Sequence, residues 1–290
     1  MLGRLSLFVL LVGALLFGAL LAERSSHAGT SVHFLSVGQG DCTVILHEDW
    51  VVLVDTGPRH DGYDAGDRIV IPALRKLGVR KIDVIVLTHP DGDHAGGLSA
   101  LAHRYRIGRV LVAGHFSNDE KMLSIMRQSG LPVGKFKFVA GHSWAELGDL
   151  RLDLYSPNVT PSTSANDGSM FVMAGVEGAA VLLTGDAGQE VEQGAIAAGI
   201  DWDVDVLQAG HHGSKGATSR LWLAATTPEH VVFSAGRNNV YGHPHPSAVL
   251  RAIQSGASVW RTDSVGTVSF RLEEGKFVRV TNFRTSRSAP

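Results

Sequence analysis

The segment Thr-His-Pro-Asp-Gly-Asp-His at residues 88–94 constrains this chain more strongly than any other feature of its sequence. It directly follows residues 82–87, an apolar, β-branched run that is broken only by Asp83. Such a run is typical of a strand that is buried on both faces. We therefore expect the segment to form a loop at the carboxyl end of a strand, where sheet proteins commonly place functional sites.

Two imidazoles and two carboxylates fall within six residues of this segment: His89, Asp91, Asp93 and His94. Nitrogen and oxygen donors at this spacing suit one or two divalent ions, and Gly92 allows the backbone to turn sharply. The alternative is a polar turn in which an aspartate caps a helix beginning near Ala95. That alternative would suit an isolated Asp-Gly-Asp, whereas the full set of four favours a metal site. The single cysteine, Cys42, excludes a disulfide and a cysteine-based zinc site.

Short β-rich runs alternate with glycine turns and helical stretches from residue 31 onward, without an internal repeat of fixed short period. Strands are expected at residues 31–37, 42–47, 51–54, 82–87, 110–113, 135–139, 150–155, 169–175, 179–183, 204–207, 231–234, 258–261 and 267–271. Helices are expected at residues 68–77, 97–103, 120–129, 189–200, 219–225 and 247–255. This order indicates an α+β chain in which two packed sheets are covered by helices, a single αββα domain over residues 29–284.

The first residues have a different composition. Arg4 precedes an uncharged, mostly apolar run of 18 residues, 5–22, and small residues follow at Ser26 and Ala28. This pattern is typical of a secretory signal peptide cleaved after Ala28, but the run also reaches the lower limit for a membrane-spanning helix. Residues 1–28 are therefore predicted to be a signal peptide or an N-terminal membrane anchor, and the rest of the chain to be secreted or periplasmic. Residues 285–290 are expected to form a flexible tail.

The pattern His-x-Asp-x-Asp-His after an apolar strand, followed by two glycines, resembles the second motif of the metallo-β-lactamase superfamily. The usual pattern of that superfamily has a histidine where this chain has Asp91. Together with Val-Gly-Gln-Gly-Asp at residues 37–41, this departure resembles the extracellular hydrolase domain of the ComEC competence-protein family, over roughly residues 32–270. The resemblance implies the metallo-β-lactamase fold. It covers only the hydrolase domain of those proteins, so it does not imply DNA uptake.

Further motifs follow in the order that this fold requires. Asp55, in Val-Asp-Thr-Gly, matches the first motif, in which the aspartate supports the metal loop, the segment at residues 88–94 in this chain. Asp186, in Leu-Thr-Gly-Asp, matches the fourth motif, whose aspartate bridges two metal ions. His211 and His212, in Gly-His-His-Gly, match the fifth motif. The resemblance implies that His211 completes the shell of the second metal, while His212 faces substrate or braces the site.

Two motifs leave alternatives open. The third motif of the superfamily normally supplies a histidine, but this chain has Asn-Asp-Gly-Ser at residues 166–169, as ComEC-like proteins do. There Asn166 is expected to donate a hydrogen bond to a substrate oxyanion and Ser169 to orient it, the alternative being a polar turn before a strand. Tyr-Gly-His-Pro-His-Pro at residues 241–246 resembles a C-terminal ComEC-like motif. It implies that His243 acts as a ligand or a phosphate-binding acid.

These assignments predict two divalent metal ions, zinc or manganese. Manganese is included because the carboxylate of Asp91, in place of an imidazole, shifts the metal preference away from zinc. The predicted ligands are His89 and Asp91 for the first ion, Asp93, His94 and His211 for the second, and Asp186 as the bridge. The predicted catalytic residues are Asp93, Asn166, Ser169, His212 and His243.

The resemblance implies a phosphodiesterase or nuclease in which the metals activate water, acting on DNA or another phosphodiester. The alternatives are a hydrolase of small esters, lactones or cell-wall phosphoesters, and a catalytically silent binding module, which the intact ligand set disfavours. The net charge of −2 gives no global basic field, so nucleic acid would need a local basic patch. A Ser-His-Asp hydrolase is excluded because no Gly-x-Ser-x-Gly is present. Membrane contact is expected only through an uncleaved N-terminal segment, and the oligomeric state is left open.

Overall fold

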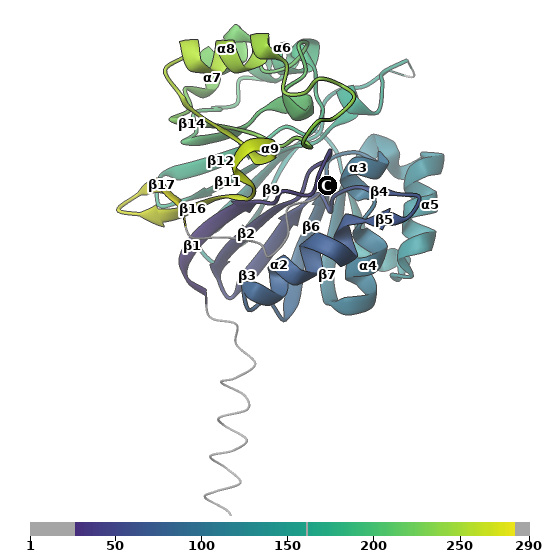
Figure 1. The fold of residues 1–290 in the computed structure, drawn as a ribbon. Helices are drawn as coiled ribbons and strands as arrows, with labels where there is room; N and C mark the ends of the chain where they lie inside the picture. The colour runs from purple at the N-terminus through teal and green to yellow at the C-terminus, as the bar shows by residue number, and fades with distance from the viewer. Residues whose placement is uncertain (1–26, 161, 282–290) are drawn as a thin grey trace, which may run out of the picture.

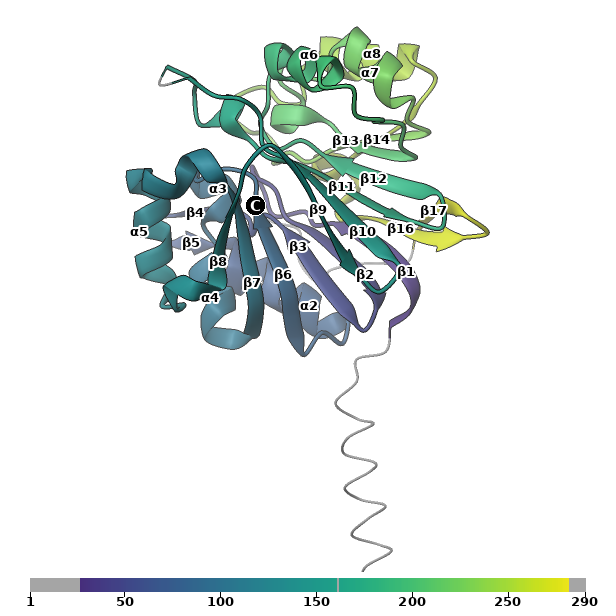
Figure 2. The same ribbon diagram turned by 180° about the vertical axis from the view of Figure 1, so that it is seen from behind.

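The computed structural model describes residues 27–160 and 162–281 (Figure 1). Two large mixed β-sheets pack against each other, and helices cover the outer face of each (Figures 1 and 2). This arrangement confirms the predicted αββα layering. The predicted leader at residues 1–28 falls almost wholly outside the described residues, as does the predicted tail at 285–290, and both stay predictions. Within the described ranges, no helix combines the length and the apolar character needed to cross a membrane.

The first sheet contains the strand that precedes the metal loop. Its order is β17 (Lys276–Val280), β16 (Val268–Glu273), β1 (His27–Phe34), β2 (Thr43–Glu48), β3 (Trp50–Val54), β6 (Lys81–Leu87), β7 (Arg106–Ala113) and β8 (Phe136–Val139). Pairing is antiparallel from β17 to β3 and parallel from β3 to β8. Because β6 is a central strand with parallel neighbours, its carboxyl end opens at the same edge of the sheet as those of β3 and β7.

The second sheet is antiparallel at one end and parallel at the other. Its order is β15 (Ser258–Arg261), β14 (His230–Phe233), β13 (Val206–Gln208), β12 (Ala179–Leu183), β11 (Phe171–Val176), β10 (Leu150–Tyr155) and β9 (His142–Leu147). Strands β12 to β15 are parallel, and β9 to β12 are antiparallel. The carboxyl ends of β12 and β13 therefore deliver the segments after Leu183 and Gln208 to one edge. A short separate hairpin is formed by β4 (Arg59–His60) and β5 (Tyr63–Asp64).

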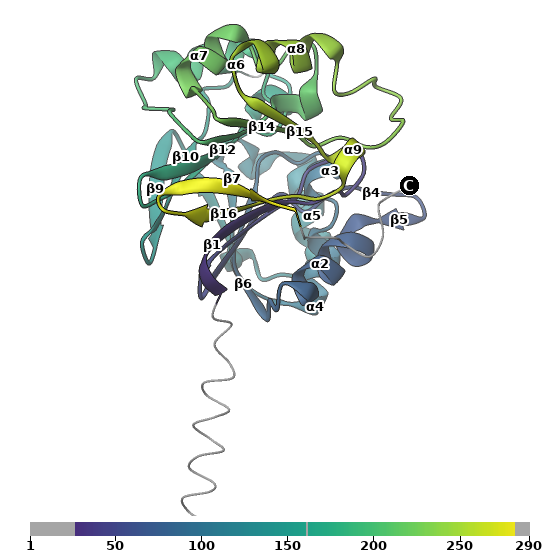
Figure 3. The same ribbon diagram turned by 60° about the vertical axis from the view of Figure 1, so that its left-hand side comes forward.

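Each sheet has its own set of covering helices (Figure 3). Four helical segments lie on the first sheet: the π-helical turn η1 (Gly66–Val70), α2 (Ile71–Lys76), α4 (Leu98–Arg104) and α5 (Glu120–Ser129). Three helices lie on the second sheet: α6 (Gln189–Ala197), α7 (Arg220–Thr226) and α8 (Pro246–Gln254). The remaining helical segments are short. They are the one-turn helices α3 (Gly92–Ala95) and α9 (Thr262–Val265) and the 3-10 turns η2 (Gly114–Asn118), η3 (Val133–Lys135), η4 (Asn166–Gly168) and η5 (Gly210–Gly213).

Alternation along the strands divides the apolar side chains between two cores. Phe171 and Val172 are neighbours in β11, yet Val172 belongs to the core between the sheets and Phe171 to the core under α6–α8. In the second core, Phe171 packs edge-to-face with Trp202 and Trp222, with ring centroids 5.9 and 5.5 Å away. Such aromatic pairs contribute about 0.5–1.5 kcal/mol each beyond the area that they bury. Burial on both faces thus holds the central strands, and with them the loops at their ends.

The sequence patterns did not predict β9, β17 or the hairpin β4–β5. Strand β9 alternates exposed and half-buried side chains and pairs only with β10, so its sequence has no apolar run. The predicted helix at residues 68–77 starts two residues earlier, with a π-helical turn at Gly66. A Cβ on Gly66 would lie 2.6 Å from the Gly97 carbonyl oxygen, so this start requires glycine. These differences concern edges and element ends, where local sequence signals are weakest.

Candidate metal centre

Close backbone contacts hold the metal loop between two neighbouring loops. The carbonyl of Asp93 accepts the Asp41 N–H at 3.2 Å, and the carbonyl of His94 accepts the Thr56 N–H at 2.6 Å. Two glycines make this approach possible. A Cβ on Gly40 would lie 2.3 Å from the Asp93 carbonyl oxygen, and one on Gly97 would lie 2.2 Å from that of Thr56. The position of the loop therefore depends on residues far away in the sequence.

Asp55 orients the buried ring of His94. Its carboxylate accepts hydrogen bonds from the backbone N–H and the hydroxyl of Thr88, both at 2.8 Å, and from His94 Nδ1 at 2.7 Å. A carboxylate can only accept, so Nδ1 carries the hydrogen and Nε2 points to the other side of the ring. Carboxylate–histidine pairs of this kind fix metal-ligating imidazoles in proteins. This geometry agrees with the supporting role expected of Asp55.

Four buried side chains bring potential ligand atoms within 4.8 Å of one another: Asp41, His94, Asp186 and His212. His94 Nε2 lies 3.1 Å and His212 Nε2 lies 3.6 Å from Asp186 Oδ1. On the far side of the cluster, His212 Nδ1 lies 3.4 Å from Asp41 Oδ1. Asp41 was not predicted as a site residue, although it ends the Val-Gly-Gln-Gly-Asp segment that supported the family resemblance.

Several atoms around this cluster are buried without a hydrogen-bond partner among the described residues: Asp41 Oδ1, His89 Nε2, His94 Nε2 and Asp186 Oδ1. Leaving one such group unsatisfied costs about 1–3 kcal/mol. Neutral imidazole nitrogens and carboxylate oxygens are the donors that zinc and other divalent transition metals bind. The chemistry of the donor set and these unpartnered atoms both fit a divalent cation, so the cluster is a candidate metal site.

The pKa shifts show how strongly the cluster favours positive charge. Burial would lower the pKa of His94, but the carboxylates of Asp186 and Asp55 raise it well above its usual value. Burial would likewise lower the pKa of His212, but the carboxylates of Asp186 and Asp41 raise it well above its usual value. Burial would raise the pKa of Asp186, yet His212 and His94 hold it well below its usual value. Protons on two imidazoles thus supply positive charge between carboxylates, and a cation that binds there would displace them.

The remaining predicted ligands of the metal loop lie on two sides of this cluster. Asp93 Oδ2 lies 3.3 Å from His212 Nε2, and although burial opposes it, this hydrogen bond lowers the pKa of Asp93 to about 2. His89 Nε2 lies 3.8 Å from Asp91 Oδ2. Burial, together with the charge of His94, lowers the pKa of His89 to about 4, so its ring is neutral. All four residues of the motif therefore face a common region.

Lys121 is a further residue of this region that the sequence did not indicate. Its ammonium lies 2.7 Å from the second oxygen of Asp91, Oδ1. Lys121 belongs to the first turn of α5, a helix that lies beside the one-turn helix α3 (Figures 1 and 2). No motif includes it, and only the packing of α5 brings it to Asp91.

The two adjacent histidines of η5 point in different directions. His211 and His212 have φ values of 49° and 53°, which turn the backbone sharply between the two rings. His212 is buried, and its Nδ1 lies 3.1 Å from the carbonyl oxygen of Ser234. The side chain of His211 is one-third exposed, with Nε2 3.6 Å from Asp186 Oδ2. The prediction placed His211 beside Asp93 and His94; the structure places His212 there and His211 at the margin.

The predicted catalytic residues of the third and C-terminal motifs separate into buried and open positions. Ser169 is fully buried; its Oγ accepts the Asp186 N–H at 3.1 Å and lies 3.3 Å from His89 Nδ1. Asn166 Nδ2 lies 3.3 Å from His211 Nε2. The ring of His243 lies 5.7 Å from that of His211, and burial, aided by the charge of His212, lowers its pKa. Ser169 therefore braces two candidate ligands, whereas Asn166 and His243 line the open side of the site.

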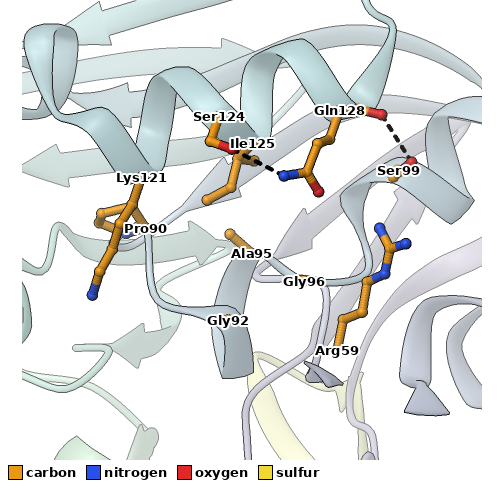
Figure 4. A pocket seen from close by; sticks show the side chains of 10 residues that line it. All are labelled: Arg59, Pro90, Gly92, Ala95, Gly96, Ser99, Lys121, Ser124, Ile125 and Gln128. Atoms are coloured by element: carbon orange, nitrogen blue, oxygen red, sulfur yellow. Dashed lines mark hydrogen bonds between the residues drawn. The ribbon is translucent and has the colours of Figure 1, made fainter. Parts of the chain in front are cut away.

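An open cavity of about 340 Å³ gives access to the site. Its walls are formed by Gln39, Asp91, Gly92, Asp93, Lys121, Asn166, Asp186, His211, His212, Tyr241 and His243. A second cavity of about 300 Å³ lies behind Gly92 and Lys121. There Lys121, Ile125 and Gln128 of α5 face Ala95, the last residue of α3, and Gly96 after it (Figure 4). Gly92 and Lys121 line both cavities.

Known proteins resemble the chain both in sequence and in fold. The family model of the metallo-beta-lactamase superfamily matches residues 35–237. ComE operon protein 3 of Bacillus subtilis is 30% identical over 258 residues, which are 83% of this chain and 33% of that protein. Recombination protein 2 of Haemophilus influenzae is 31% identical over 254 residues, 88% of this chain and 30% of that protein. The chain therefore spans about a third of these relatives.

The solved structures give the same result for the fold. The metallo-beta-lactamase fold protein YhfI from Bacillus subtilis superposes with a TM-score of 0.53 at 13% identity, over 83% of this chain and 99% of that one. The predicted resemblance to competence proteins and the predicted fold are both confirmed. Together, the matched family model, the αββα architecture and the buried His and Asp cluster at the sheet edge show that this chain belongs to the metallo-beta-lactamase superfamily.

Proposed function

We propose that this chain is an exported, metal-dependent phosphodiesterase that acts on nucleic acid. The observation that carries the proposal is the buried cluster of Asp41, His94, Asp186 and His212 beside an open cavity. Three of these side chains have an atom without a hydrogen-bond partner in the described part of the chain. Buried carboxylates and imidazoles are costly to fold without a cation, which argues against a silent binding module.

The proposed ligand set differs from the predicted one at a single histidine. Four side chains would hold one ion: Asp93, His94, Asp186 and His212. Asp41 would support the two imidazoles from behind, because its carboxylate lies beside Nδ1 of both rings. A second ion would lie between His89 and Asp91, with Asp186 as the bridge. We choose His212 rather than His211 because its Nε2 lies within 3.6 Å of both Asp93 Oδ2 and Asp186 Oδ1.

A divalent ion in this cluster would supply Lewis-acid activation of a water molecule and offset the charge that develops on the phosphate. Lys121 and Asn166 line the same cavity and would hold the non-bridging phosphate oxygens, because both side chains are hydrogen-bond donors. Burial lowers the pKa of His243. Its ring would therefore contribute one neutral N–H donor at neutral pH rather than a positive charge.

The lining of the cavity supports a phosphodiester over a lactone or a small apolar ester. Charged, amide and imidazole side chains make up almost the whole wall, and Tyr241 is the one large apolar surface among the described residues that line it. Pockets that recognise small apolar ligands are lined mainly by hydrophobic side chains. The name of one relative, a recombination protein, agrees with a nucleic-acid substrate.

The test uses the full chain, stripped of metal with a chelator and reloaded separately with zinc and manganese. We expect two bound ions per chain, and metal-dependent cleavage of bis(p-nitrophenyl) phosphate and of DNA. Asp186→Ala should lower both activities by about a hundredfold or more, because it removes the bridging carboxylate. Asp149→Ala, at an exposed position, is the matched control. Lactone hydrolysis without phosphodiester cleavage would favour the alternative, and no hydrolysis with any metal would refute the proposal.

Export and location form a separate part of the proposal, supported by the pattern of residues 1–28. The native chain should appear outside the cytoplasm after cell fractionation. Mass spectrometry of its N-terminus would distinguish a cleaved signal peptide from a retained anchor. Recovery only with cytoplasmic markers would contradict this part and leave the metal chemistry untouched.

A further inference from the structure

A groove of about 540 Å³ adjoins the metal cavity and has no part in the chemistry proposed above. Gln39 and Tyr241 line both spaces, so the two adjoin at these residues. The groove runs between the β4–β5 hairpin and the segment after β14. Gly236 lies in its floor, where a Cβ would meet the backbone nitrogen of Gln39 at 2.7 Å. The segment after β14 therefore packs directly against the loop that carries Gln39.

An exposed aromatic ring stands at this junction. The Tyr241 side chain is 68% exposed, and its ring lies nearly parallel to that of His243, with centroids 5.9 Å apart and an angle of 27° between the planes. The turn that holds it is well ordered by hydrogen bonds. Asn239 Oδ1 accepts the N–H groups of Tyr241 and His243, and Asn239 Nδ2 donates to the carbonyls of Gly236 and His243. Tyr241 thus presents a bare ring face from a braced backbone.

The opposite wall contains a second set of flat groups. His60 and Tyr63 stack with centroids 5.2 Å apart and 20° between the planes. The guanidinium of Arg68 lies 5.5 Å from the centre of the Tyr63 ring, and the Tyr63 hydroxyl donates to the carbonyl of Val37. This wall therefore combines π-faces with a cation, held by the β4–β5 hairpin.

Two guanidinium groups in the groove remain available to an anion. Arg68 donates to the carbonyl of Gly62, and Arg237 donates to the carbonyl of Asp263. Within the described residues, neither of them forms an ion pair with a carboxylate. Asp61 is the one carboxylate among the described side chains that line the groove. Positive charge beside bare aromatic faces is the combination by which proteins bind single strands of nucleic acid.

We propose that this groove binds an unpaired stretch of a nucleic-acid strand and guides the adjoining phosphate to the metal site. A base stacks on Tyr241, and flanking phosphates contact Arg68 and Arg237. Stacking on an exposed ring requires an unpaired base, since bases in a duplex already stack on their neighbours. The inference rests on the proposed phosphodiesterase function and adds its substrate class, a single strand rather than a small diester.

The test measures binding without catalysis, on the full chain freed of metal by a chelator. Two fluorescently labelled strands of equal length, an oligothymidylate and an abasic strand, are titrated by anisotropy. Tyr241→Ala should weaken binding of the oligothymidylate by about 5- to 150-fold and leave that of the abasic strand unchanged. Tyr241→Phe keeps the ring and should stay within about twofold of the original chain. Arg237→Gln should weaken both strands, because it removes a phosphate contact.

Equal affinity of the Tyr241→Ala variant and the original chain for the oligothymidylate would overturn the inference, and so would an equal loss on both strands. Thymidine monophosphate that competes as well as the whole strand would assign the groove to a mononucleotide and overturn it too. Cleavage of bis(p-nitrophenyl) phosphate without strand binding would refute the groove alone. Base-dependent binding without cleavage under any metal would support the groove and refute the proposed function.

Discussion

Replacing Asp55 with asparagine changes the network behind His94 while keeping the size of the side chain. The backbone also favours this substitution, because Asp55 has a φ of 60° and asparagine is among the residues that adopt this left-handed conformation most readily. The Thr88 N–H can still donate to the amide oxygen, and the Thr88 hydroxyl can still accept from the amide nitrogen. The contact with His94 Nδ1, at 2.7 Å, is the one that must change.

An amide N–H that faces His94 Nδ1 requires that nitrogen to accept, and the ring hydrogen then moves to Nε2. That atom lies 3.1 Å from Asp186 Oδ1 and is the one that would bind metal. Loss of a carboxylate behind a ligating histidine typically costs 10- to 100-fold in metal affinity. We therefore expect Asp55→Asn to weaken metal binding by about 1.4–2.7 kcal/mol.

The assay is competition for zinc against a chromophoric chelator, after circular dichroism has shown that the variant is folded. Asp205→Asn is the matched control: Asp205 also accepts a backbone N–H, that of Ala180 at 2.7 Å, but in the second sheet. The control should bind zinc as the original chain does. Unchanged affinity in folded Asp55→Asn would show that the carboxylate does not set the tautomer of His94.

Three further predictions address the ligands, the packing and the pH dependence of folding. His212→Ala should weaken zinc binding by at least about tenfold in the same competition assay, and His211→Ala by less, because His212 is the buried partner of the carboxylates. Gly97→Ala should lower the free energy of unfolding in urea by about 3 kcal/mol, since the new methyl group would meet a backbone oxygen, while Gly194→Ala in open space should not destabilise the chain. Burial raises the pKa of Glu192 above 4.5, so the folded state holds its proton more tightly than the unfolded state does. Its contribution to stability should therefore decrease as pH rises from 4.5 through the folded pKa, and a pH series of urea unfolding should show this decrease in the original chain and not in Glu192→Gln.

Much of the fold could be predicted because its central elements carry strong local signals. The predicted strand at 150–155 and the predicted helix at 120–129 coincide with β10 and α5. Strand β6 was identified by its apolar run, which is broken only by Asp83 and reflects burial on both faces. Strand β9 was not predicted because it is an edge strand with one side in solvent, and its sequence contains no apolar run that would indicate a strand.

In the candidate site, local sequence signals predict some of the residues but not others. A motif that packs four ligands into six residues predicts metal by itself. It does not predict which of two adjacent histidines turns inward. The inward orientation of His212 depends on the positive φ of both His211 and His212. It also depends on the Ser234 carbonyl oxygen, which lies within hydrogen-bond distance of His212 Nδ1. Asp41 and Lys121 were missed for the same reason, because tertiary packing alone brings them to the loop.

The charges of Asp41 and Lys121 bear on the predicted number of metal ions. Five carboxylates gather around the site: Asp41, Asp55, Asp91, Asp93 and Asp186. Without metal, protons on His94 and His212 and the ammonium of Lys121 leave part of that negative charge unbalanced. Two divalent ions together with Lys121 would balance it completely, with every imidazole neutral and free to bind. One ion would leave two of these five negative charges unbalanced, so we expect two ions rather than one.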